Sequence, residues 1–234
     1  MGKGWKKAGM AEVAAKEGKL FTKLAREIYV AAKLGGPDPE GNPRLKIAIR
    51  AALDESCPKT TIERAIKKAS GEGDDGQNFE DVTYEGQGPH NVGIIVECQT
   101  DNRNRTVTNI RNAFNKNGGK MGDQGSVGWM FDRVSLIEGK KEGDFDPEEE
   151  AIEANANEVE HDATENLYSF YGNPEDLDVI RTALSDRGWD ITTAELSYKP
   201  KNITELDEAQ KAEVETLLEA LDDDDDSHRI YATI

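Results

Sequence analysis

The spacing of the apolar residues changes at one point in the chain, and this change constrains the fold more than any other feature. Up to residue 70 the apolar residues recur at helical spacing. From about residue 80 they alternate or form short continuous runs, which is typical of strands. The segment between, residues 71–76, has the glycine-rich composition of a linker. We therefore expect a helical first part followed by a part built on strands.

Three amphipathic helices are predicted in the first part. The first carries an apolar stripe that begins at Phe21 and ends at the Gly35-Gly36-Pro37 stop. Asn42 and Pro43 have the residue types of an N-cap and a first helical residue, and they open the second helix. The third spans residues 62–69. Short connections predict a small bundle, and residues before about 18 are lysine-rich and weakly patterned, which predicts a mobile arm.

The second part contains a recognisable order of elements. From Ser135 to residue 199 the pattern predicts β-α-β-β-α-β, the ferredoxin-like arrangement. The preceding strands, predicted at 82–84, 92–98 and 127–131, form an incomplete domain that the last helix (206–221) and last strand (230–234) would complete. The predicted fold class is α+β, with an N-terminal three-helix domain followed by two α/β domains, one inserted in the other. The predicted domains are residues 1–75, residues 78–134 with 200–234, and the inserted residues 135–199.

Charge is distributed unevenly along the chain. Residues 1–70 carry 15 Lys/Arg and 8 Asp/Glu, whereas residues 71–234 carry 14 and 39. The formal net charge of −18 therefore conceals a basic N-terminal part attached to a strongly acidic body. A polyanion such as DNA or RNA would be attracted to the first part and repelled by the second.

The basic residues of the N-terminal part, with two arginines of the body, are the candidate nucleic-acid contacts. Trp5 offers a ring for stacking beside lysines that can contact phosphates, although an ordinary soluble terminus is the alternative. Arg103 and Arg105 stand near a predicted helix start, where cations are unfavourable unless they bind a phosphate or pair with nearby carboxylates, and pairing is the favoured alternative. The predicted contacts are Lys3, Trp5, Lys6, Lys7, Lys16, Lys19, Lys23, Arg26, Lys33, Arg44, Arg64, Lys67, Lys68, Arg103 and Arg105.

Several other sites are not expected. The glycine-rich residues 118–126 lack the Gly-Lys-Ser/Thr ending of a phosphate loop and predict a helix C-cap and turn. Residues 222–226 are all aspartate, but without a bending glycine they predict a solvated stretch and not a calcium site. Scattered histidines and two unpaired cysteines predict neither zinc nor disulfides. We expect no metal, no cofactor, no secretory signal, no membrane segment and a cytoplasmic location.

Several stretches along the chain occur together in a recognisable order. They are residues 18–23, 35–39, 42–45, 62–66, 84–89, 101–106, 117–119 and 125–127 with Phe131, and the acidic run before His228-Arg-Ile-Tyr231. These stretches resemble the YebC/PmpR family nearly over the full length, although the family's usual His-Ser-Lys-Trp opening is reduced to Lys3-Gly-Trp-Lys6. The resemblance implies a helical domain and two α/β domains, one interrupting the other, and no catalytic activity. Members of the family are described as cytoplasmic DNA-binding transcriptional regulators, and some, including mitochondrial translational activators, act at the ribosome.

Three hypotheses about function follow. The leading one is a non-enzymatic DNA-binding transcriptional regulator whose basic helical domain contacts phosphates, while the acidic domains orient the complex or contact a basic protein surface. The second is a translation factor that binds rRNA or tRNA on the ribosome. The third, with the weakest support, is an enzyme that uses loops 86–89, 101–106 and 118–126 as one pocket.

Overall fold

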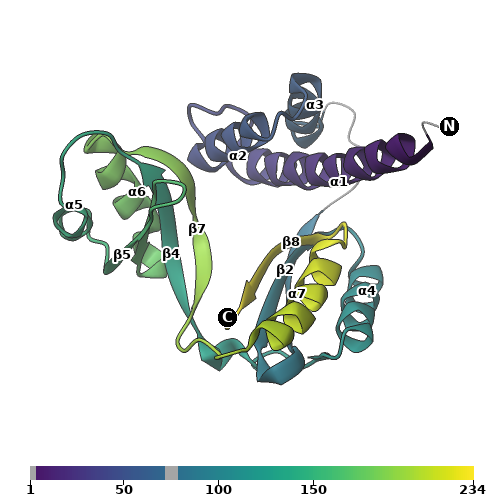
Figure 1. Cartoon of the computed structure of the whole chain (residues 1–234). Helices are drawn as coiled ribbons and strands as arrows, with labels where there is room; N and C mark the ends of the chain where they lie inside the picture. Colours follow the sequence, from purple (N-terminus) through teal and green to yellow (C-terminus); the bar gives the residue numbers. More distant parts are fainter. Residues whose placement is uncertain (1–3, 72–78) are drawn as a thin grey trace. The chain divides into compact units, whose positions relative to one another are not determined.

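The structure, a computed structural model, describes residues 4–71 and 79–234, with side chains from residue 18 onward. The helices and strands follow one another along the chain as drawn in Figure 1. They are α1 (Gly4–Gly35), α2 (Pro43–Asp54), α3 (Lys59–Ala69), β1 (Glu80–Gln87), β2 (Gly93–Thr100), α4 (Arg103–Lys116), β3 (Lys120–Met121), β4 (Phe131–Lys140), α5 (Pro147–Glu153), β5 (Glu158–Asp162), β6 (Leu167–Gly172), α6 (Leu177–Asp186), β7 (Asp190–Pro200), α7 (Glu208–Asp222) and β8 (Ser227–Ala232).

The α+β class predicted from the sequence is confirmed. Three helices precede two four-stranded sheets, whose strand orders are β3-β1-β2-β8 and β5-β6-β4-β7. The chain divides into two compact units, Met1–Tyr84 with Val96–Gly118 and Glu215–Ile230, and Glu85–Ile95 with Gly119–Val214 and Tyr231–Ile234. The three-domain division with residues 135–199 inserted stays a prediction.

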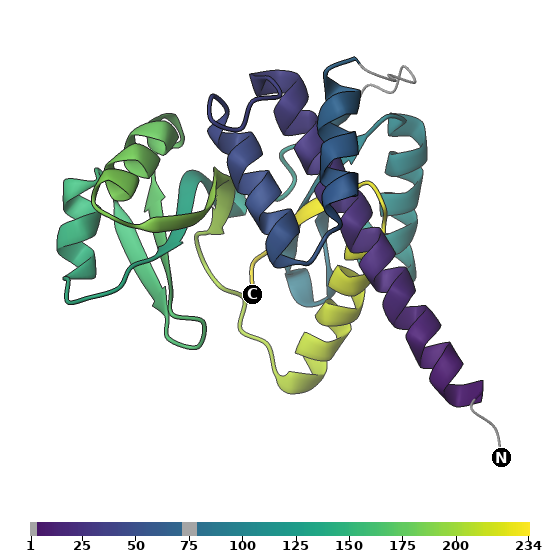
Figure 2. The ribbon, with the colours of Figure 1, turned by 90° about the horizontal axis from the view of Figure 1, so that it is seen from above.

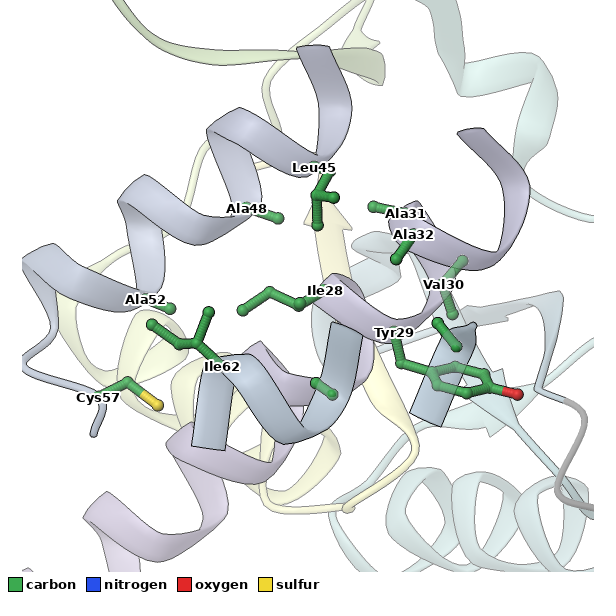
Figure 3. Packing of buried hydrophobic residues seen from close by; sticks show 12 residues of the cluster. Ile28, Tyr29, Val30, Ala31, Ala32, Leu45, Ala48, Ala52, Cys57 and Ile62 are labelled. Atoms are coloured by element: carbon green, nitrogen blue, oxygen red, sulfur yellow. The ribbon is translucent and has the colours of Figure 1, made fainter. Parts of the chain in front are cut away.

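In the first unit, α1 packs along α2 and α3, as Figure 2 shows from above. Ile28, Leu45 and Ile62 converge at the centre of this packing (Figure 3), and each is at most 5% exposed. Burying side chains of this size contributes about 1.5–3 kcal/mol each. This contribution helps to offset the conformational entropy that is lost when the three helices become ordered. Asn42 caps α2 through Leu45 N–H as predicted, and its amide also donates to the carbonyls of Ala31 and Gly36.

Helix α1 starts earlier than the sequence pattern suggested. It begins at Gly4, whereas residues before about 18 were expected to form an arm without regular structure. The segment 8–17 is rich in Ala and Glu, which are strong helix formers, so propensity continues the helix where no apolar stripe requires it.

The second unit contains the predicted β-α-β-β-α-β order, here β4-α5-β5-β6-α6-β7. Strand β4 pairs antiparallel with both β6 and β7, and β5 pairs antiparallel with β6. Helices α5 and α6 cover one face of this sheet (Figure 1), where Ile137, Phe170 and Leu184 are fully buried. The arrangement is the ferredoxin-like one that the sequence predicted.

One predicted strand is wrong. Residues 127–131 form a short apolar run, but residues 128–130 form a 3-10 turn and the strand begins only at Phe131. The physical reason is that the backbone N–H groups of Val127 and Gly128 donate to the Glu85 carboxylate, at 2.8 and 2.7 Å. These donors are therefore not available to a sheet ladder.

Candidate nucleic-acid interface

Three of the predicted contact residues on α1, Lys19, Lys23 and Arg26, form a basic stripe (the α1 stripe) that contacts the acidic run Asp222–Asp226 of the same unit. Lys19 Nζ lies 3.1 Å from an oxygen of Asp223, and Lys23 Nζ lies 2.8 Å from an oxygen of Asp222. Both lysines also donate to the backbone carbonyl of the same aspartate. Arg26 donates to the carbonyls of Gln99 and Asp225, each at 2.7 Å. The stripe therefore already has an anionic partner within the protein.

Asp226 is the buried centre of this contact. Its side chain is 2% exposed and accepts hydrogen bonds from Arg26 at 3.2 Å, from Arg105 at 2.7 Å and from Thr106 at 2.7 Å. Burial alone would raise the pKa of this carboxyl, but the hydrogen bonds from Arg105 and Thr106 hold the pKa below its ordinary value. Asp226 therefore links α1 to α4 as a charged carboxylate.

These contacts correct in part the expectation that residues 222–226 form a solvated stretch, because Asp226 is buried and Asp224 is half-buried, whereas Asp222, Asp223 and Asp225 are exposed as expected. The predicted end of the helix is confirmed, because α7 stops at Asp222. The residues after it turn toward α1, because three cations there compensate the cost of burying a carboxylate. In the described part of the chain, no group of three or more His, Cys, Asp or Glu side chains has the arrangement of a metal site.

A second ion pair fixes Arg44. Its guanidinium donates to both oxygens of Glu27, at 2.8 and 3.1 Å, and Gln99 donates to one of them at 2.8 Å. Burial alone would raise the pKa of Glu27, but Arg44 lowers it below the ordinary value. His228 lies 3.3 Å from the same carboxylate. Burial, with Arg229 nearby, lowers the pKa of His228 to about 4, so that its imidazole is neutral at pH 7.

Arg103 and Arg105 pair with carboxylates, which is the alternative to phosphate binding that the sequence favoured. Arg103 lies 2.8 Å from an oxygen of Glu80, and Arg105 binds Asp101 as well as Asp226. Asn102 caps α4 through the N–H of Arg105, so the polar cluster starts the helix as predicted. Their predicted contact with phosphates stays a prediction.

The outer face of α3 differs from the α1 stripe. Thr60, Arg64 and Lys67 recur at helical spacing and are all exposed. Within residues 18–71 and 79–234, whose side chains the structure describes, neither Arg64 nor Lys67 makes an ion pair. The last turn of α3 favours cations because of the helix dipole, which explains Lys67 and Lys68 in part. Arg64 stands outside that turn and has no such explanation.

A cleft of about 810 Å³ lies in the first unit between α1, α3 and the start of α4. Its lining is cationic on the α3 side, with Arg64 and Lys68, and anionic on the side of Asp224–Asp226. Phe21, Tyr29 and Phe79 line its floor, and the Arg26 guanidinium lies 4.7 Å from the centre of the Phe79 ring. The cleft therefore joins Arg64, one of the exposed cations of α3, to aromatic surface.

The remaining predicted contacts are placed as follows. Lys33 Nζ lies 6.0 Å from the centre of the Tyr29 ring. The side chains of Lys3, Trp5, Lys6, Lys7 and Lys16 lie outside the described residues.

Across the parts of the chain that the structure describes, no helix combines the length and the apolar character that a membrane crossing needs.

Comparison with family models gives two matches that together span most of the chain. Residues 3–72 match the TACO1/YebC protein N-terminal domain, and residues 79–234 match the TACO1/YebC second and third domain. The boundary between the two matches falls in the predicted linker.

Individual relatives agree with these matches. The chain is 61% identical to the probable transcriptional regulatory protein Bd1964 of Bdellovibrio bacteriovorus, over all of both chains. It is 43% identical to the probable transcriptional regulatory protein YrbC of Bacillus subtilis, over 93% of this chain and 90% of that protein. The crystal structure of the conserved hypothetical protein Aq1575 from Aquifex aeolicus is similar with a TM-score of 0.80 and 41% identity, covering 95% of this chain and 92% of that one.

Proposed function

Since this chain belongs to the TACO1/YebC family, we propose that it is a regulatory protein that binds DNA through the outer face of α3. The relatives are named probable transcriptional regulatory proteins, and regulation of transcription is exercised on DNA. The proposal includes no catalytic step.

One observation about charge carries the proposal. The chain has 47 Asp and Glu against 29 Lys and Arg, so a cation in this protein has many carboxylates to pair with. Lys19, Lys23 and Arg26 of α1 are paired in this way, and so are Arg44, Arg103 and Arg105. Arg64 and Lys67 are exposed and have no carboxylate partner among the described residues. Unpaired cations on one helix face are the arrangement that phosphate contacts require.

The outer face of α3 carries both signs of charge. Helix α2 precedes α3 across the short connection 55–58, and the exposed side chains of α3 are Lys59, Thr60, Glu63, Arg64 and Lys67. Lysine and arginine bind phosphates whatever the base sequence, so we propose that Arg64 and Lys67 contact the DNA backbone. We expect binding that depends strongly on salt and weakly on sequence.

The test is the salt dependence of binding for the double variant Arg64→Ala/Lys67→Ala. On duplex DNA, each phosphate contact contributes about 0.9 to the steepness of the plot of log affinity against log salt concentration. The variant, which lacks two contacts, should therefore show a slope that is shallower by about 1.8. Affinity at low salt should fall about tenfold or more. Binding of a labelled DNA duplex, measured by fluorescence anisotropy between about 50 and about 200 mM salt, gives both quantities.

The matched control is Arg181→Ala/Lys211→Ala, which removes the same charge from cations that have carboxylates three residues away. It should leave the slope within error of the parent. An unchanged slope in the α3 variant would contradict the assignment of the interface. Absence of duplex binding at low salt, or a clear preference for RNA of the same sequence, would contradict the DNA proposal itself.

A further inference from the structure

Trp129 is a large aromatic side chain that the fold holds in an exposed position. It is 69% exposed, and its indole N–H donates to the backbone carbonyl of Ser126 at 3.1 Å. This hydrogen bond satisfies the only polar group of the indole. The surface left for a partner is therefore the flat aromatic ring.

The loop that carries Trp129, residues 122–130, is fixed by a carboxylate. Glu85, on β1, is only 9% exposed. Its two oxygens accept the backbone N–H groups of Gly125, Val127 and Gly128, at 2.7, 2.8 and 2.7 Å. Hydrogen bonds to an ionised acceptor are about twice as strong as neutral ones, so three of them hold the loop firmly.

Two glycines let this loop close. A Cβ atom at Gly122 would lie 2.4 Å from Ser126 Oγ and 2.8 Å from Ser126 Cβ, so a larger residue would force the turn apart. Gly125 has a φ of +87°, which L side chains rarely adopt. A buried anion and two glycines thus fix a loop whose one large exposed apolar side chain is Trp129.

We propose that Trp129 is a stacking site for an unpaired base of the nucleic acid that this protein binds, an inference that rests on the function proposed above. Stacking on an aromatic ring needs a flat face and accepts any base. No second large exposed apolar side chain lies within residues 118–130. Within this segment the exposed apolar surface is therefore a single aromatic ring.

A cation for the neighbouring phosphate is present on the same segment. Lys120, on β3, leads into the loop and is exposed. In the part of the chain whose side chains are described, it makes no ion pair. Aromatic rings for bases together with cations for phosphates are the combination by which proteins bind single strands, and this segment carries one of each.

The test compares two probes on the full-length protein, a single-stranded oligonucleotide and its abasic counterpart, which keeps the phosphates and lacks the bases. The parent should bind the base-containing strand more tightly than the abasic one. Trp129→Ala should weaken binding of the base-containing strand by about 5- to 100-fold and leave abasic binding nearly unchanged. Trp129→Tyr should restore most of the loss, because it keeps an aromatic face.

The control is Ile152→Ala, which removes an apolar side chain of similar exposure, 74%, from α5. It should bind both strands as the parent does. Glu85→Gln weakens the acceptor that positions the loop and should reduce only binding of the base-containing strand.

The two proposals fail in different ways. Equal binding of both strands by the parent, or an unchanged affinity in Trp129→Ala, overturns the stacking site, and the exposed ring would then suit a protein partner. If neither strand binds, the stacking site is overturned. The proposed function is tested separately by the anisotropy assay with duplex DNA, and absence of duplex binding there overturns it.

Discussion

Replacing Asp226 with alanine should lower the free energy of unfolding by about 3–5 kcal/mol, the range seen when one partner of a buried ionic cluster is removed. Asp226 is 2% exposed and holds Arg26, Arg105 and Thr106. Its loss removes the carboxylate that compensates both guanidinium groups, and leaves Arg26 with backbone carbonyls and Arg105 with Asp101 as partners. Urea unfolding followed by circular dichroism at pH 7 measures the change.

The matched control is Asp223→Ala, in the same acidic run. Its carboxylate is 71% exposed and pairs with Lys19, which is 45% exposed. Exposed pairs contribute about 0–1 kcal/mol, so this variant should unfold nearly as the parent does. Equal, small losses in both variants would show that Asp226 is not the centre of the contact.

The pKa of Asp226 adds a pH dependence to the same prediction. The folded protein holds this pKa below its value of 3.8 in the unfolded chain. A carboxyl with a lowered folded pKa contributes stability that is complete above the unfolded pKa and is lost as pH falls through the folded pKa. The difference in unfolding free energy between the parent and Asp226→Ala should therefore shrink below about pH 3.8.

Neutralising the two exposed aspartates that hold the α1 lysines should strengthen binding to DNA. Asp222→Asn/Asp223→Asn keeps the shape of the side chains and removes the charges opposite Lys19 and Lys23. If both lysines then contact phosphates, the salt slope should increase by about 1.8, and affinity at low salt should rise about tenfold. Anisotropy titrations of the same duplex over the same salt range measure both changes.

The control for this variant carries the same change in net charge. Glu215→Gln/Glu219→Gln neutralises two exposed carboxylates of α7 that make no ion pair within the described residues. A smaller gain in the control than in the aspartate variant supports a specific competition for the lysines. The same gain in both variants would show a general effect of net charge and no role for the acidic run.

The regular elements could be predicted from the sequence because they are recorded in local patterns. Ile28 and Leu45 lie on apolar stripes, and Asn42 before Pro43 signals a cap; all three have the predicted structural roles. The same locality explains the errors. The start of α1 depends on helix propensity without an apolar stripe. Residues 127–130 are not a strand because two of their backbone N–H groups donate to Glu85, which is about forty residues away in the sequence.

The candidate site was predicted less well, because its electrostatics depend on distant pairs. Lys23 and Asp222 are separated by 199 residues, and Arg105 and Asp226 by 121. A single sequence gives charges but not their partners, so the α1 stripe and Arg64 look equally available. Glu85 and Asp226 carried no local signal of burial, since Glu85 stands between the predicted strand 82–84 and a glycine-rich stretch, and Asp226 ends a run of identical residues.

Ultraviolet crosslinking in living cells is the most direct test of the proposed contact between α3 and nucleic acid. Bound nucleic acid would be identified by sequencing, and the crosslinked peptides by mass spectrometry. We expect the recovered nucleic acid to be DNA and the crosslinks to include the peptide that carries Arg64 and Lys67. Crosslinks confined to other parts of the chain, or recovery of RNA alone, would contradict the claim.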